Sequence, residues 1–85
     1  MNSTELKNEL HKEVTEEIKG CCHYLDMAEA AEELGENALA LGLFLMAKDE
    51  LSHAKFAEEH IDLLTPEQRE MHSKAKMRLE HFANK

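Results

Sequence analysis

Residues 33–37, Glu-Leu-Gly-Glu-Asn, separate two long stretches of sequence that are rich in helix-forming residues. Gly35 is the residue type that most often follows the end of a helix, and Asn37 is a type that often caps the start of one. This pattern predicts one helix over residues 4–34 and a second over residues 38–64. Because the loop between them is short, the two helices should form an antiparallel hairpin.

A second break lies at residues 65–68, Thr-Pro-Glu-Gln. Thr65 can cap a helix, Pro66 suits the first helical position, and Gln68 completes a capping box three residues after the threonine. These signals predict a third, shorter helix over residues 66–83. The sequence therefore predicts an all-α fold, with residues 1–85 forming a single domain of one hairpin and a short C-terminal helix.

Composition limits the classes of protein that fit. A chain of 85 residues is too short for a two-domain enzyme, and 42% hydrophobic residues are too many for a disordered chain. A net charge of −8 argues against nucleic-acid binding, and no stretch approaches the ~20 apolar residues of a membrane span. Residues 1–5 lack a signal-peptide pattern, and the adjacent Cys21 and Cys22 are a poor disulfide framework. We expect a cytoplasmic protein with free thiols.

Both long helices carry an apolar stripe that polar residues interrupt. The stripe predicted for the first helix consists of Leu10, Val14, Cys21, Tyr24, Ala28 and Ala31. The stripe predicted for the second consists of Leu39, Leu43, Met46, Ala57, Ile61 and Leu64. Glu17 occupies a position in the first stripe, and Glu50 and His53 occupy two positions in the second. The third helix offers a narrower stripe of Met71, Ala75, Leu79 and Phe82.

The three interrupting residues should meet inside the protein. In a hairpin centred near residues 35–36, Glu17 and His53 lie at the same height, and Glu50 lies one helical turn from His53. Two buried carboxylates without a counter-ion would cost several kcal/mol, and a bound cation removes that penalty. Because one hairpin buries little apolar surface, we expect a two-fold homodimer that forms a four-helix bundle and doubles the set to four glutamates and two histidines.

Residues 47–57, Ala-Lys-Asp-Glu-Leu-Ser-His-Ala-Lys-Phe-Ala, resemble the metal-binding helix of rubrerythrin and other ferritin-like di-iron proteins. The chain is similar to one half of a ferritin-like bundle, as in the short two-helix encapsulated ferritins. The resemblance implies two iron ions per dimer, with Mn or Zn as alternatives, held by Glu17, Glu50 and His53. It also implies a homodimer or larger homo-oligomer that acts as a ferroxidase or reduces peroxide, with O₂ or peroxide as oxidant. The chain departs from full-length rubrerythrins, which carry further carboxylates and a four-cysteine iron–sulfur domain, and residues 81–85 lack the apolar docking tail of encapsulated cargo.

Residues near the three ligands have open alternatives. The Tyr24 hydroxyl either supports a ligand carboxylate near the metals or belongs to a core aromatic residue. Glu13 is a candidate auxiliary ligand, whereas Glu16 points off the stripe. We expect Cys21 to be a buried thiol, and we expect His60 to be partly exposed. The remaining histidines are expected in solvent: His11, His23, His72 and His81.

Two other classes of function fit the same pattern. The first is a metal-free helical dimer that acts as an interaction module, in which the polar positions fix the register of the interface. The second is a metal carrier or sensor that binds an ion without turnover. Binding of Fe²⁺ and its subsequent oxidation distinguish these classes from a di-iron enzyme.

Overall fold

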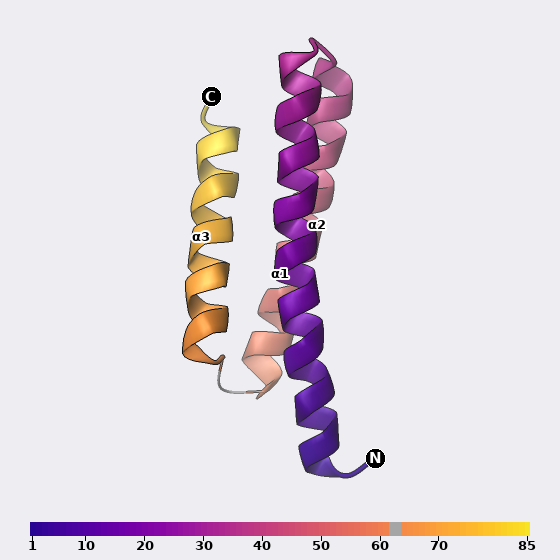
Figure 1. Cartoon of the computed structure of the whole chain (residues 1–85), viewed down its shortest axis with the longest axis vertical. Helices are drawn as coiled ribbons and strands as arrows, with labels where there is room; N and C mark the ends of the chain where they lie inside the picture. Colours follow the sequence, from indigo (N-terminus) through magenta and orange to yellow (C-terminus); the bar gives the residue numbers. More distant parts are fainter. Residues whose placement is uncertain (62–63) are drawn as a thin grey trace.

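The structure, a computed structural model, describes the backbone of residues 1–61 and 64–85 and the side chains of these residues except 56–58, 60 and 61. The described residues form three helices and no strand: α1 (Ser3–Glu33), α2 (Asn37–Ile61) and α3 (Pro66–Ala83). The two long helices pack against each other as a hairpin, and α3 runs along one side of the pair (Figure 1). The all-α prediction is therefore confirmed. None of the described helices is both long and apolar enough to cross a membrane.

The bounds of α1 follow from its caps. The helix begins one residue before the predicted range because Asn2, rather than Ser3 or Thr4, is the cap. The Asn2 side chain accepts a hydrogen bond from the backbone N–H of Glu5, and the Glu5 carboxylate accepts one from the N–H of Asn2. At the other end Leu34 is the cap, and Gly35 follows with a φ of +76°, a left-handed conformation that favours glycine.

The second helix differs from its predicted range of residues 38–64. Asn37 lies inside α2 rather than before it, and Leu64 lies outside any helix. Residues 62–63 of the predicted range lie outside the described residues. The third helix occupies its predicted range, and Thr65 and Gln68 form the predicted capping box before it.

The core lies between α1 and α2, under α3. The buried residues of α1 are Val14, Ile18, Cys21, Leu25, Ala28 and Ala31. Those of α2 are Ala40, Ala47, Leu51 and Ala54. Burial raises the pKa of the Cys21 thiol to about 11, so that this thiol stays protonated at neutral pH. Both cysteines are free, and Cys22 is half-buried.

The stripe predicted for α2 is wrong for the single chain. Leu39 is 56% exposed and Met46 is 45% exposed, while the buried stripe that starts at Ala40 is shifted by one residue. The reason is that α2 is apolar on more than one face, and its alanines allow the closer approach to α1. The Ala57 and Ile61 side chains of the predicted stripe lie outside the described residues.

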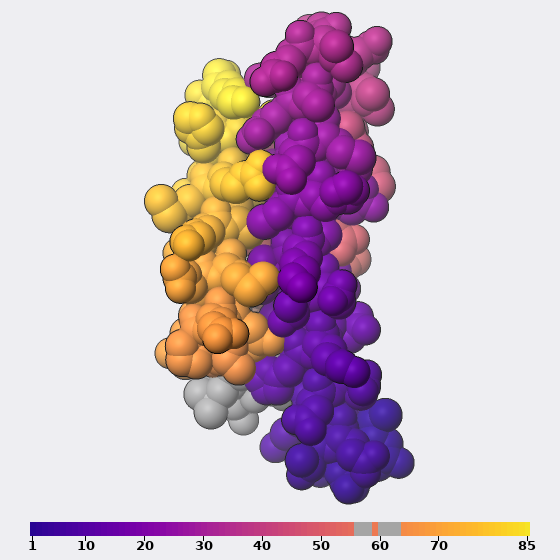
Figure 2. All heavy atoms as spheres, in the orientation of Figure 1, coloured from indigo at the N-terminus to yellow at the C-terminus, as the bar shows by residue number. Residues whose placement is uncertain are grey.

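One side of the hairpin is covered by α3, and no described segment covers the other side. Phe82 of α3 stacks on Phe44 of α2 with ring centroids 5.2 Å apart, and Ala75 and Leu79 are buried against the hairpin. Figure 2 shows the side chains of α3 packed along α1. Helical periodicity puts another set of residues on the side away from α3, here called the open face. It includes Leu6, Glu13, Glu17, Gly20, Tyr24 and Met27 of α1 and Leu39, Leu43, Met46, Glu50 and His53 of α2.

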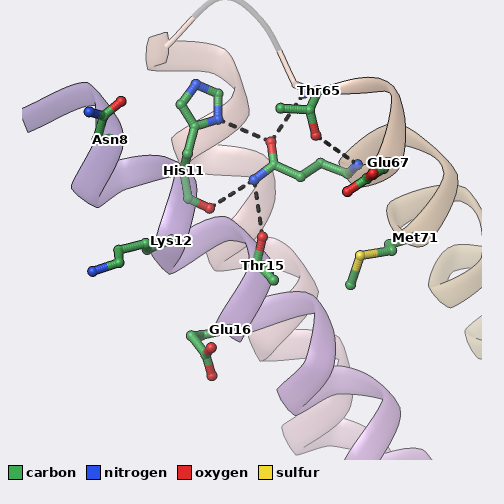
Figure 3. Close-up of a pocket in the computed structure, with 9 residues that line it drawn as sticks. Asn8, His11, Lys12, Thr15, Glu16, Thr65, Glu67 and Met71 are labelled. Carbon is green, nitrogen blue, oxygen red and sulfur yellow. Dashed lines mark hydrogen bonds between the residues drawn. The ribbon is translucent and has the colours of Figure 1, made fainter. Parts of the chain in front are cut away.

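The start of α3 is tied to α1 by the buried side chain of Gln68. Its amide nitrogen donates to the backbone carbonyl of His11 at 2.8 Å and to the Thr15 hydroxyl at 3.1 Å. Its amide oxygen lies 3.0 Å from His11 Nδ1 and accepts from the N–H of Thr65 (Figure 3). Because the amide oxygen is an acceptor, His11 Nδ1 is the donor in that bond. Ion pairs of Arg78 with Asp26 (2.9 Å) and of Lys85 with Glu32 (3.2 Å) hold the other end of α3.

Replacement of Gln68 by alanine should detach the start of α3. The change leaves the half-buried Thr15 hydroxyl, the His11 carbonyl and the Thr65 N–H without this partner, which costs about 1–3 kcal/mol of unfolding free energy. Chemical denaturation followed by circular dichroism measures this loss. Arg69→Ala, at the exposed neighbouring position, is the control and should change stability by less than about 0.5 kcal/mol. Equal effects of the two variants would contradict the anchoring role.

Candidate metal centre

The three predicted ligands, Glu17, Glu50 and His53, lie together on the open face. One ligand atom from each residue falls within 4.8 Å of the other two. The Nδ1 atom of His53 lies 3.3 Å from the Oε2 atom of Glu17, across the interface between α1 and α2. Glu50 and His53 come from adjacent turns of α2, so that α2 supplies two ligands and α1 supplies one. The level pairing of the two helices predicted from the hairpin turn is therefore confirmed.

The sequence pattern predicted these ligands inside the protein, and in the single chain they lie at its surface. The His53 side chain is 62% exposed, and the Glu17 side chain is 23% exposed. The α1–α2 core passes beneath them through Ala47, Leu51 and Ala54. Because α3 lies on the opposite side of the hairpin, it does not enclose the three candidate ligands.

The surroundings of Glu50 disfavour its ionised form. The contact with the Glu17 carboxyl raises the pKa of Glu50, partial burial and the charge of Glu17 raise it further, and the charge of His53 opposes this. A cation between the two side chains would remove the repulsion. Carboxylate oxygen and imidazole nitrogen donors suit Fe, Mn or Zn, and this donor set is compatible with each of these metals.

The other described candidates near the ligands are not part of the three-residue cluster. Tyr24 is half-buried and packs against the core, and within the described part of the chain no hydrogen bond joins its hydroxyl to a ligand. Cys21 is fully buried as expected, below the face that bears the ligands. Glu13 and Glu16 are both exposed, and neither joins the three-residue cluster. The side chain of His60 lies outside the described residues.

His11 is a residue that the sequence pattern misassigned. It was expected in solvent, but it is half-buried and bonded to Gln68. Together with Thr15, Thr65 and Met71 it lines a hollow of about 500 Å³ between α1 and the start of α3 (Figure 3). The polar groups of His11, Thr15 and Thr65 bond to Gln68, so that this hollow serves the packing of α3.

Metal-free protein should lose stability as the pH rises through the titration of Glu50. The raised pKa means that the folded state holds this proton more tightly than the unfolded state, whose glutamates titrate near ~4.3. The contribution is therefore fully present below ~4.3 and is lost as the pH passes the folded pKa. Glu50→Gln lacks this titration, so the variant should gain stability relative to the parent between pH 4 and pH 7.

Urea denaturation of both proteins with a chelator present measures this difference. Added metal should reverse the trend in the parent, because the ligands must lose their protons to bind it. A stability difference between parent and variant that stays constant with pH would contradict the repulsion between Glu17 and Glu50.

Comparison of the chain with protein-family models, with curated proteins and with solved structures finds no match. Among the described residues, Glu17, Glu50 and His53 form a group that could hold a metal ion.

Proposed function

We propose that two copies of this chain form a ferritin-like four-helix bundle that encloses a dinuclear iron site and acts as an iron or peroxide oxidoreductase. Glu17, Glu50 and His53 of both copies are its ligands. The observation that carries the proposal is the approach of three potential ligand atoms from two helices to within 4.8 Å of one another, on a side of the hairpin that α3 does not cover.

The apolar character of the open face supports dimerisation. Leu39, Met46 and Leu6 are each about half exposed on it, and they lie on both sides of the ligands along the hairpin. Exposed apolar side chains on the same face as a few polar groups are a common feature of protein–protein interfaces. A second hairpin on this face would bury these side chains and remove water from the ligands.

The position of the ligands along α1 supports a two-fold arrangement. Glu17 lies near the midpoint of α1, which spans Ser3–Glu33. A two-fold axis perpendicular to the helices at this height would bring the two sets of ligands together and overlap the hairpins along their whole length. The exposed Leu6 of one copy would then lie near the hairpin turn of the other.

The side chains of this chain have separable roles. Four carboxylates per dimer neutralise two divalent cations and, as anionic oxygen donors, favour the ferric over the ferrous state. The Nδ1 atom of His53 faces the carboxylates and is the ring nitrogen placed to bind. When bound, two ferrous ions supply two electrons, enough to reduce one O₂ to H₂O₂, or one H₂O₂ to two water molecules, with two protons from solvent. The apolar residues of the open face exclude bulk water from this reaction.

Anaerobic titration of the metal-free protein with Fe²⁺, followed by exposure to air, tests the proposal. We expect uptake of about one iron per chain and oxidation much faster than that of free Fe²⁺ in the same buffer. Absence of uptake would contradict the metal site and favour the metal-free interaction module. Uptake without faster oxidation would contradict the catalytic part and favour a carrier or sensor.

A further inference from the structure

Gly20 is a glycine in the interior of a long helix, where glycine is unfavourable by roughly 0.5–1 kcal/mol relative to alanine. Its backbone conformation does not require glycine, since Gly35 is the glycine with a positive φ. The presence of glycine at position 20 therefore needs a reason other than backbone conformation.

The space beside Gly20 is filled by Glu50. A Cβ atom built on Gly20 would lie 3.0 Å from Glu50 Oε2, 3.4 Å from its Cδ and 3.6 Å from its Cγ. The end of the Glu50 side chain thus rests on the bare backbone of α1. Glu17 lies three residues before Gly20, on the adjacent turn of the same face. Gly20 therefore leaves room for the Glu50 carboxylate at the height where it meets Glu17.

We propose that Gly20 is a positioning residue. Because it has no side chain, the Glu50 carboxylate of α2 can extend across the interface to α1 and join the metal-binding cluster. This inference rests on the proposed metal site. An alanine at position 20 would push the carboxylate aside by a few tenths of an ångström or more. Because the atoms displaced are the far end of a flexible side chain, the metal-free fold would lose little, whereas a metal ion requires the carboxylate in place.

The test compares Gly20→Ala with Gly42→Ala. Gly42 is also a glycine in the interior of a long helix, and a Cβ atom there would meet nothing within 4 Å. Both variants should raise the Tm of the metal-free protein by about 2–8 °C, because alanine is the better helix former. Only Gly20→Ala should weaken binding of Fe²⁺ under anaerobic conditions, by about 10–100-fold, while the mass of the metal-free dimer stays unchanged.

A higher Tm together with weaker Fe²⁺ binding in Gly20→Ala would distinguish a positioning role from a structural one. A Gly20→Ala protein that binds Fe²⁺ as tightly as the parent would overturn the inference and leave the proposed function intact. A lower Tm, or a loss of the dimer that accompanies the loss of binding, would also overturn it, because Gly20 would then serve packing. A parent protein that takes up no Fe²⁺ would overturn the proposed function itself, and with it the positioning role.

Discussion

Replacement of Glu50 or His53 by alanine is expected to abolish iron binding and leave the helical content of the chain unchanged. Each residue supplies one of three ligand atoms that lie within 4.8 Å of one another. In the proposed dimer, this substitution removes one donor from each copy, and so two of six ligands. We expect the remaining four ligands to be too few to bind iron. Neither side chain belongs to the α1–α2 core, so the fold does not depend on them.

Anaerobic Fe²⁺ titration with parallel far-ultraviolet circular dichroism measures both outcomes. Glu17→Ala should behave in the same way, whereas Glu16→Ala is the matched control because Glu16 is its exposed neighbour outside the cluster. A Glu50→Ala protein that binds iron like the parent would contradict the ligand assignment. Equal losses in Glu16→Ala and Glu17→Ala would show that net charge, and not position, governs binding.

A charged residue introduced on the open face is expected to prevent dimerisation. Leu39→Glu should convert the proposed dimer into monomers, because the proposed interface would then bury two carboxylates among apolar side chains. A penalty of about 3 kcal/mol per dimer weakens association about a hundredfold. Iron binding should fall with it, because a single chain offers only half of the ligands.

Leu41→Glu is the matched control for this change. Leu41 is 57% exposed and Leu39 is 56% exposed, but the two residues lie roughly 200° apart around α2. Sedimentation at micromolar concentration should therefore give a monomer for Leu39→Glu and a dimer for Leu41→Glu. Dimers from both variants would mean that another face mediates association. A monomeric parent would contradict the enclosed site.

Local signals in the sequence predicted the three helices, apart from the exact ends of α1 and α2, and the meeting of Glu17, Glu50 and His53. The bounds of α3 follow from Thr65, Pro66 and Gln68, and the turn follows from Gly35, because these residues act through their own backbone and side-chain chemistry. The meeting of Glu17 with His53 followed from the symmetry of a hairpin about its turn. Such signals need no knowledge of how the helices pack.

Packing contacts between distant residues were not predictable in the same way. Residues 39–47 are apolar in every direction around α2, so periodicity alone could not show that Ala40 faces α1 and Leu39 does not. The bond between His11 and Gln68 joins residues 57 positions apart and has no local pattern. No local sequence signal predicts the role of Gly20, because its contact with Glu50 depends on the distance between two helices.

The structure of the protein crystallised with Fe²⁺, with iron located by its anomalous scattering, tests the enclosed dinuclear site most directly. We expect two chains packed through their open faces, with two iron ions between them, each in contact with carboxylates from Glu17 and Glu50 and with a His53 imidazole. Chains packed through other faces, with these three side chains in solvent or with iron bound elsewhere, would contradict the account.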